Sequence, residues 1–479
     1  MTFYSSQNRN AELRPRLDQD GLNLTPSQVA TTAYTPSMVD TSAAIQDRRL
    51  QEDYDAADDG MSGRSRYTYR SEVDADLFLK RIGGRAFNAL SDTYFLPSDD
   101  NEWVRLNKQH VGLVLALGEL YPAGEEVRAI LAPVPGQTKR ILDLGCGTGV
   151  WTMDMAREFP HAEVVGVDLA PVPIDPETLP PNCRFEIDDI NLGLDHLKDT
   201  FDVVHVRFVG SGLKDFKKTM DDASRCLKPG GIALWIEADW NTYAEDQRVC
   251  IPLALEEDEE NPDQGERSWF QRIVFEMGRG MRMGNSDLDG MFKAMDYGLW
   301  DNKWIDPETC GMSSLYLPIG PWARGKSHMD TQRLGYVGAL MRQDFMRVHR
   351  AGHPVMKRLG WEAEKLEKWS ELADKQMMDM SPKTWFRVSY AWGRRRAAEN
   401  EPAPPLPQLA SSTTTEADSG HPYPHYYVYA TQQEALSAAA LRNRSKDCDP
   451  PPLPRPRAAE PEPVTADVDQ GQESTSAVD

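Results

Sequence analysis

The feature that most constrains the fold is a glycine-rich turn in the segment RILDLGCGTGVWTMDMA, residues 140–156. An apolar run leads into Gly145, Gly147 and Gly149, and a helical pattern begins directly after them. Glycine lets the backbone approach a ligand closely, and the N-terminus of the following helix offers free N–H groups and a partial positive charge. The segment therefore predicts a strand, a ligand-binding turn and a helix in direct succession.

Alternating strand and helix patterns continue along the chain from this turn. Further apolar segments are expected to be buried strands, at residues 162–169, 183–188, 201–208 and 231–238. Helical patterns fall at residues 102–120, 149–159 and 216–227. Apolar strands that alternate with helices indicate a parallel sheet covered by helices on both faces, which is an α/β architecture.

Charge and cysteine content exclude several classes of function. The 479 residues include 53 Lys and Arg against 75 Asp and Glu, a net charge of -22. Such a chain repels a polyphosphate backbone, so direct binding of nucleic acid is not expected. The six cysteines form no CxxC pair, which is typical of reduced thiols and indicates no zinc site. No apolar leader or membrane-spanning run is present, and we expect a cytoplasmic or nuclear location.

Composition divides the chain into an ordered domain and two tails. Residues 1–70 are polar and aperiodic, and residues 399–479 are rich in Pro, Glu and Ser, so both tails are predicted to be disordered. They are candidate surfaces for protein partners. Within the second tail, residues 431–444 have the pattern of one short helix capped by Thr431. The domain itself is expected to span residues 71–398, with its core at 139–240.

Acidic residues at the predicted strand ends separate two classes of ligand. The turn has the spacing GxGxG rather than the GxGxxG of dinucleotide-binding proteins, and Asp143 lies two residues before its first glycine. An acid there favours a ligand with a cationic group over a pyrophosphate. Asp168 ends the second strand, where its carboxylate can accept hydrogen bonds from ribose hydroxyls; this feature alone also suits NAD. Asp188 or Asp189 after the third strand can accept from an adenine amino group.

The ordered set of motifs resembles the class I S-adenosylmethionine-dependent methyltransferases, and among them the fungal LaeA-like methyltransferases of secondary metabolism. The resemblance rests on RILDLGCGTGVWTMDMAREFPHAEVVGVDLAPV, PPNCRFEIDDI, FDVVHVRFVGSGLKDF and ASRCLKPGGIALWIEAD. GRAFNALSDTYFLPSDDNEWVRLNKQH upstream, with YLPIGPW and TWFRVSYAWGRRR downstream, extends it to about Gly84–Arg396.

This resemblance implies a Rossmann-like sheet of seven strands, the last antiparallel, with helices on both faces and an N-terminal helical cover. The last strand would be WFRVSYAWG, residues 385–393, and the strand before it DNKWIDPE, residues 301–308. Residues 313–380 would form a helical insertion over the substrate pocket. The cofactor implied is S-adenosylmethionine.

Carried over residue by residue, the resemblance and the strand-end pattern give one set of cofactor-binding candidates. They are Tyr94, Arg105, Asp143, Gly145, Cys146, Gly147, Gly149, Asp168, Leu169, Asp188, Asp189, Ile190 and Arg207. Arg207 would bind the methionine carboxylate or, alternatively, a surface acid. Tyr94 and Arg105 would close over the cofactor or, alternatively, serve helix packing and a surface ion pair.

Methyl transfer from a sulfonium asks a protein mainly to align donor and acceptor and to exclude water. A hydroxyl acceptor would also need a general base within hydrogen-bond reach. The candidates are His205 and Glu237, with His110 a further possibility on the N-terminal helix. Alternatively, His205 packs against a helix covering the sheet, and Glu237 hydrogen-bonds a loop backbone.

Two functions fit these residues. The favoured one is an enzyme that methylates an oxygen or nitrogen atom of a small secondary metabolite, because a complete cofactor site is combined with an insertion able to line a pocket. The alternative is a LaeA-like nuclear regulator of secondary metabolism that acts through protein partners, for which the tails would be binding surfaces. An NAD-dependent reductase is disfavoured by Asp143 and by the glycine spacing.

Overall fold

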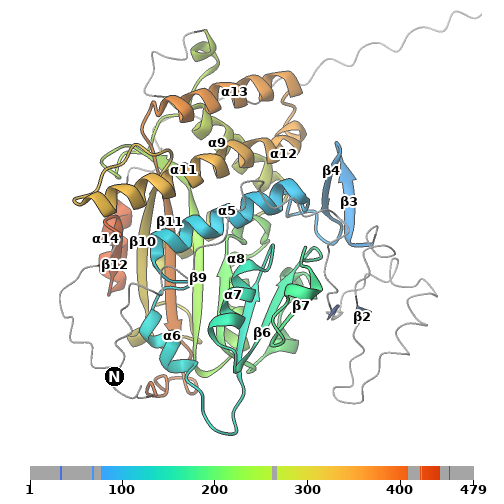
Figure 1. Cartoon of the computed structure of the whole chain (residues 1–479), viewed down its shortest axis with the longest axis vertical. Helices are drawn as coiled ribbons and strands as arrows, with labels where there is room; N and C mark the ends of the chain where they lie inside the picture. The colour runs from blue at the N-terminus through green and yellow to red at the C-terminus, as the bar shows by residue number, and fades with distance from the viewer. Residues whose placement is uncertain are drawn as a thin grey trace, which may run out of the picture.

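The computed structural model describes residues 33–34, 67–68, 77–260, 267–407, 421, 423–442 and 453. These residues form one large twisted sheet with helices on both faces and a further helical layer at one end of the strands (Figure 1). A separate hairpin of β3 (Leu79–Ile82) and β4 (Arg85–Asn88) lies beside it. Most of the predicted N-terminal tail lies outside the described residues.

The sheet contains the seven strands expected from the resemblance. They are β5 (Lys139–Leu144), β6 (Ala162–Asp168), β7 (Cys183–Ile187), β8 (Phe201–Arg207), β9 (Leu227–Tyr243), β10 (Gly311–Pro318) and β11 (Trp385–Arg394). Their order across the sheet is β10-β11-β9-β8-β5-β6-β7. Strand β11 runs antiparallel to both of its neighbours, whereas the pairs from β9 to β7 are parallel. The Rossmann-like arrangement with an antiparallel last strand is therefore confirmed.

Three short strands extend this arrangement to ten. Strand β12 (Tyr426–Tyr429) pairs with β10, while β1 (Ala33–Tyr34) pairs with β7 and β2 (Tyr67–Thr68) pairs with β1. The prediction of disorder across residues 399–479 is thus wrong for β12. The short helix predicted within this tail is present as α14 (Gln432–Leu441), and the Thr431 side chain caps it by accepting a hydrogen bond from the Glu434 N–H at 3.2 Å.

The strand before the last was assigned to the wrong residues. Residues 301–308 form a loop and a short 3₁₀ helix, because the Asp306 side chain accepts from the Glu308 N–H and Pro307 has no N–H to offer a neighbouring strand. Strand β10 lies further along the chain and is buried throughout. Residues 313–318, predicted to begin the helical insertion, therefore belong to the sheet, and the insertion follows them.

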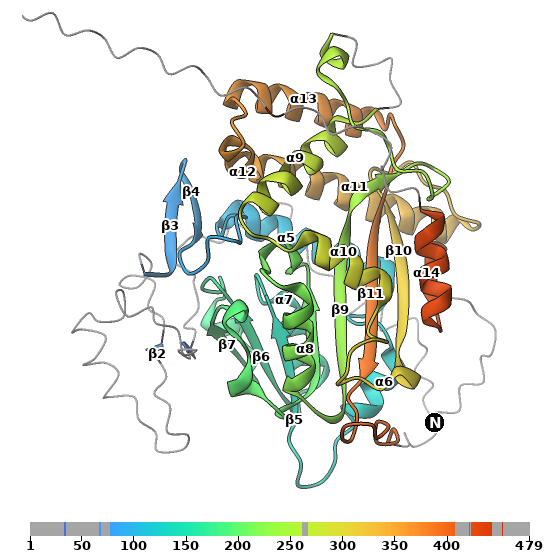
Figure 2. The same cartoon turned by 180° about the vertical axis from the view of Figure 1, so that it is seen from behind.

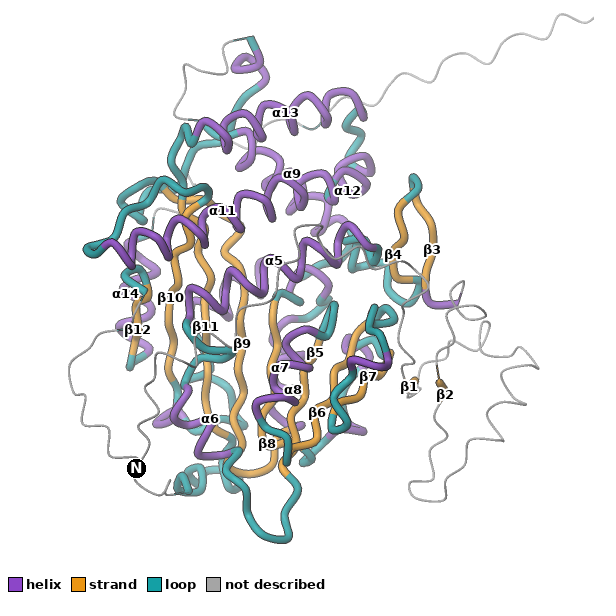
Figure 3. Tube along the Cα trace, in the orientation of Figure 1, coloured by secondary structure: helices purple, strands orange, loops and turns teal. Residues whose placement is uncertain are grey.

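The insertion consists of three helices. They are α11 (His328–Ala351), α12 (His353–Arg358) and α13 (Ala363–Asp379). Together with α9 (Trp269–Met283) they make the helical layer seen beyond the carboxyl ends of the parallel strands in Figure 3. No helix within the described ranges is long and apolar enough to cross a lipid bilayer.

Helices cover both faces of the sheet, so apolar side chains are buried on each side of it. Helices α5 (Asp100–Leu117), α6 (Gly124–Ile130) and α7 (Val150–Glu158) lie on the face seen in Figure 1. Helices α8 (Phe216–Cys226), α10 (Leu288–Tyr297) and α14 lie on the face seen in Figure 2. Trp151 of α7 and Trp235 of β9 are buried. Helix α5 starts where the Asp99 side chain accepts from the Glu102 N–H, and it lies across the face of the sheet seen in Figure 1.

Candidate functional site

The glycine turn between β5 and α7 requires glycine for two physical reasons. Gly145, Gly147 and Gly149 have φ angles of 73°, 58° and 70°, in the left-handed region that other residues rarely adopt. A Cβ atom on Gly145 would overlap the Val209 side chain. Because glycines have no side chain, the backbone of the turn lies directly at the surface of the neighbouring pocket.

Asp168 at the end of β6 holds this turn in place. Its carboxylate accepts a hydrogen bond from the Gly147 N–H at 2.8 Å and another from the Ala170 N–H at 3.1 Å. Burial raises its pKa to about 6, although these hydrogen bonds act in the opposite direction. The carboxylate lines the pocket and has further lone pairs with which to accept hydroxyl groups of a ligand.

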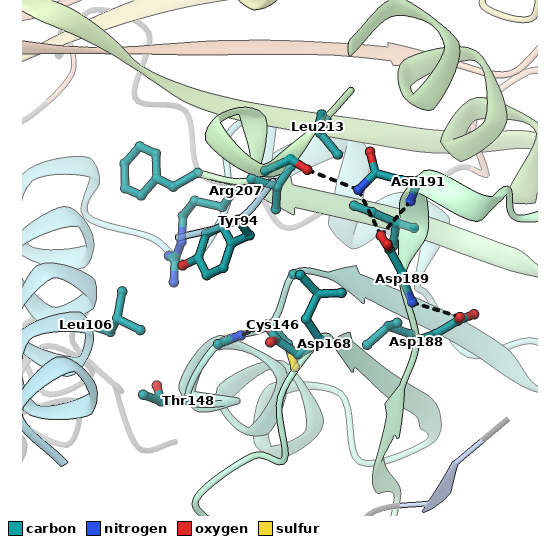
Figure 4. Close-up of a pocket in the computed structure, with 18 of the residues that line it drawn as sticks. Tyr94, Leu106, Cys146, Thr148, Asp168, Asp188, Asp189, Asn191, Arg207 and Leu213 are labelled. Atoms are coloured by element: carbon teal, nitrogen blue, oxygen red, sulfur yellow. Dashed lines mark hydrogen bonds between the residues drawn. The ribbon is translucent and has the colours of Figure 1, made fainter. Parts of the chain in front are cut away.

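The loop after β7 forms the opposite end of the pocket. The Asp189 side chain caps a short 3₁₀ helix, η3 (Ile190–Leu192), by accepting from the Asn191 N–H at 3.0 Å. The Asn191 amide then donates to the Gly212 carbonyl at 3.0 Å, which joins this loop to the loop after β8 (Figure 4). These hydrogen bonds hold the two loops of the pocket wall together.

Arg207 ends β8 and brings a positive charge to the pocket. Its guanidinium takes part in no ion pair with any described residue, and burial lowers its pKa below the usual value. Both terminal nitrogens lie 3.4 Å from Nδ1 of His110 on α5. A partly buried cation without a carboxylate partner among the described residues is suited to bind an anionic group.

The pocket lies between α5, the glycine turn and the ends of β6, β7 and β8, and it has a volume of about 810 Å³ that includes space open to solvent (Figure 4). It combines backbone N–H groups, carboxylates, one guanidinium and an apolar wall that contains Ile190 and Leu213. These groups are complementary to an amino acid, a pair of hydroxyls and a flat ring with an amine. The residues present therefore fit S-adenosylmethionine.

Ten of the thirteen predicted cofactor residues line this pocket. They are Tyr94, Gly145, Cys146, Gly147, Asp168, Leu169, Asp188, Asp189, Ile190 and Arg207. Gly149 is not among the lining residues; a Cβ atom there would overlap the Phe185 ring, so its importance is in the packing behind the turn.

Asp143 and Arg105 also lie outside the pocket lining. Asp143 is buried below it, where its carboxylate accepts from the Thr152 hydroxyl at 2.6 Å and contacts His205 Nδ1 at 2.7 Å. Arg105 is buried between α5 and α11, where it pairs with Glu102 at 2.6 Å and with Asp344 at 2.7 Å. The predicted alternative of a surface ion pair was wrong for Arg105, because the helical insertion covers it.

The two predicted catalytic candidates lie behind the pocket wall. The His205 ring stacks on Trp151, with centroids 3.6 Å apart, and burial lowers its pKa. Glu237 accepts from the Val209 N–H at 3.0 Å and the Gly210 N–H at 2.8 Å, and burial raises its pKa to about 8. Their positions favour the structural alternatives: helix packing for His205 and support of a loop backbone for Glu237.

Sequence reasoning missed about half of the pocket lining. The missed residues are Leu106, Gln109, Thr148, Val150, Val167, Asn191, Phe208, Val209, Gly212 and Leu213. Asn191 directly follows the predicted adenine-binding residues, and this position could have identified it as a pocket residue. Leu106 and Gln109 come from α5, and only the packing of that helix over the turn brings them to the site.

Comparisons with known proteins identify a methyltransferase domain and relatives of this chain. Residues 121–299 match a methyltransferase domain family. The chain is 31% identical over 327 residues to the secondary metabolism regulator laeA of Coprinopsis cinerea, covering 67% of this chain and 75% of that protein. It is 35% identical over 153 residues to the methyltransferase str3 of Strobilurus tenacellus, covering 32% of this chain and 51% of that protein.

Two further similarities are more distant. The protein-methionine methyltransferase laeA of Emericella nidulans is 28% identical over 268 residues, which are 55% of this chain and 63% of that protein. A solved structure of Haemonchus contortus phosphoethanolamine N-methyltransferase 2 with S-adenosyl-L-methionine has 14% identity and a TM-score of 0.32, covering 70% of this chain and 63% of that one. The chain thus spans three quarters of the Coprinopsis protein and smaller shares of the str3 and Emericella proteins.

Proposed function

Because this chain belongs to the LaeA-like family of S-adenosylmethionine-dependent methyltransferases, we propose that it methylates an oxygen or nitrogen atom of a small secondary metabolite. The observation that carries the proposal is the pocket, in which the glycine turn, the carboxylates at two strand ends and Arg207 converge. This convergence supports a site for one complete cofactor molecule beneath the helical layer.

In this proposal each strand end holds one part of the cofactor. Asp168 accepts hydrogen bonds from the ribose hydroxyls. Asp188 or Asp189 accepts from the adenine amine, and Ile190 packs on the ring. The glycine turn and Arg207 bind the amino-acid end, where the guanidinium pairs with the carboxylate. All of these residues line the same pocket, which supports the assignment.

S-adenosylmethionine, when bound, supplies a methyl group that its sulfonium has already activated. The chain's own residues orient the acceptor and exclude water, and α5 closes one side of the pocket with Leu106 and Gln109. Glu237 fixes the Val209 and Gly210 backbone that forms part of the wall. This arrangement suits an acceptor that is nucleophilic without a dedicated base, such as an amine or an acidic hydroxyl.

A second candidate function is regulation of secondary metabolism through protein partners, in the nucleus. The observation that favours it is the length of the similarity to the Coprinopsis regulator, which extends over 75% of that protein and well beyond the methyltransferase domain match. In this case the predicted tails bind the partners, and the acceptor of the methyl group is a protein side chain.

One labelling experiment distinguishes these functions. The full chain is incubated with S-adenosylmethionine labelled in the methyl group, together with an extract of its source organism separated into small-molecule and protein fractions. Label in a small molecule supports the enzyme, and label in a protein supports the second function. Calorimetry with S-adenosylhomocysteine tests the pocket itself, and a chain that binds neither compound while folded would contradict the proposed function.

A further inference from the structure

The environment of Arg207 is unusual for a partly buried cation. The guanidinium enters the pocket from the end of β8, where Tyr94 lines the same space (Figure 4). No carboxylate among the described residues forms an ion pair with it, and it donates its hydrogen bonds to one neutral side chain, His110. The orientation of the Arg207 guanidinium in the pocket therefore depends on His110.

His110 is itself held in one orientation and one tautomer. It is buried on α5, and its Nε2 lies 3.1 Å from Oδ2 of Asp154 on α7. A carboxylate can only accept a hydrogen bond, so Nε2 carries the proton and Nδ1 keeps its lone pair. That lone pair faces both terminal nitrogens of Arg207, each at 3.4 Å.

We propose that His110 is a positioning residue, which accepts hydrogen bonds from Arg207 and aims its guanidinium at the carboxylate of the cofactor's amino-acid moiety. This inference rests on the proposed function, because it takes the pocket to be the cofactor site. Asp154 sets the tautomer, His110 presents the acceptor, and Arg207 receives the ligand. The same helix supplies Leu106 and Gln109 to the pocket, so the cover and the cation are joined through α5.

The arrangement works only while His110 is neutral. A second proton on Nδ1 removes the lone pair and places a cation beside Arg207. The charged and titratable groups that face His110 are Asp154 of α7, Asp143 of β5, and Arg207 and His205 of β8. Burial lowers the pKa of His110 from its usual value of 6.5, which keeps the ring neutral near pH 7. Cofactor affinity is therefore expected to fall in acid.

Two substitutions separate the acceptor from the rest of the side chain. In His110→Asn the amide oxygen can take the place of Nδ1 and accept from Arg207. In His110→Gln the amide nitrogen can take the place of Nε2 and donate to Asp154, but no acceptor then occupies the position of Nδ1 that faces Arg207. His328→Gln, at an exposed position at the start of α11, is the matched control.

Calorimetry with S-adenosylhomocysteine on the full chain measures the effect. We expect His110→Gln to weaken binding about tenfold at pH near 7.5, and His110→Asn and the control to stay within about twofold of the wild type. In an Arg207→Met background, His110→Gln should have no further effect, because the partner is gone. Circular dichroism verifies that each variant is folded.

The pH dependence provides a test that needs no unstable variant. As the pH falls below the usual histidine pKa of 6.5, the wild type should lose more affinity than His110→Asn, in which position 110 cannot be protonated. Asp168 titrates in both proteins, so the difference between the two profiles belongs to His110. Equal affinities for Gln and Asn variants, or identical profiles, would overturn the inference. A wild type that binds no cofactor at any pH would instead overturn the proposed function.

Discussion

The cofactor pocket and the helical cover above it are held together by contacts of different range. The glycine turn of the pocket is held between consecutive strand ends, where the hydrogen bond from Gly147 to Asp168 spans 21 positions of the chain. The cover is built from segments far apart: Arg105 of α5 pairs with Asp344 of α11, 239 positions later. His421 likewise contacts the Leu117 carbonyl at the end of α5, across 304 positions.

This difference separates what each region contributes to function. The hydrogen bond between Gly147 and Asp168 fixes the glycine turn through two neighbouring strand ends. The cover depends instead on contacts between distant segments, such as Arg105 with Asp344. We therefore expect substitutions in the pocket to affect cofactor affinity and substitutions in the cover to affect stability.

The largest expected effect comes from the glycine turn. Gly145→Val should abolish measurable binding of S-adenosylhomocysteine, because the side chain would overlap Val209 and the φ of 73° is strained for valine. A loss of more than about 4 kcal/mol of binding free energy is expected from blocking the pocket wall. Calorimetry measures it, with circular dichroism as the check on folding.

Gly136→Ala is the matched control for backbone strain. Its φ is 78°, close to that of Gly145, but a Cβ atom there meets no other atom within 4 Å. It should lower the free energy of unfolding by about 1 kcal/mol and leave cofactor affinity unchanged. If Gly145→Val bound the cofactor as well as this control does, the glycine turn would not be part of the site.

The second prediction concerns stability rather than binding. Arg105→Met should lower the free energy of unfolding by about 3 to 5 kcal/mol, because Glu102 and Asp344 would remain buried without their cation. Urea denaturation measures the loss. Cofactor affinity, extrapolated to the folded fraction, should change much less. A variant of normal stability that fails to bind cofactor would place Arg105 in the pocket rather than in the cover.

The range of the contacts also explains how much of the pocket and of the cover could be predicted from the sequence. The strand-end residues Asp168, Asp189 and Arg207 were predicted because each follows an apolar run that is itself visible in the sequence. Strand β10 was missed because its flanking loop also has an apolar residue, Ile305, and no local rule decides between them. The contact between Arg105 and Asp344 could not be predicted, because the two residues are 239 positions apart and neither local sequence indicates its partner.

Asp168→Ala should weaken S-adenosylhomocysteine binding by about 1 to 3 kcal/mol, the contribution of one or two hydrogen bonds to a charged group. Binding should also weaken as the pH falls through about 6, where this carboxyl takes up a proton. The stability of the free protein should change in the opposite sense: a carboxyl whose pKa is raised on folding favours the folded state more as the pH falls. Asp168→Asn should lack both this pH dependence of binding and this pH dependence of stability. Titration calorimetry and thermal unfolding at several pH values measure the two. Wild-type affinity for Asp168→Ala would contradict its place in the site.

The smallest expected effect lies at the far edge of the sheet. Thr431→Ala removes the cap of α14 and should cost about 1 kcal/mol locally, because the Glu434 N–H loses its acceptor. Hydrogen exchange should become faster in Gln432–Leu441 and stay unchanged in α7, and cofactor affinity should not move. Faster exchange in both helices would mean that the edge and the pocket unfold together. In that case α14 and α7 would belong to one cooperative unit, and the distinction between locally and globally stabilised regions would fail.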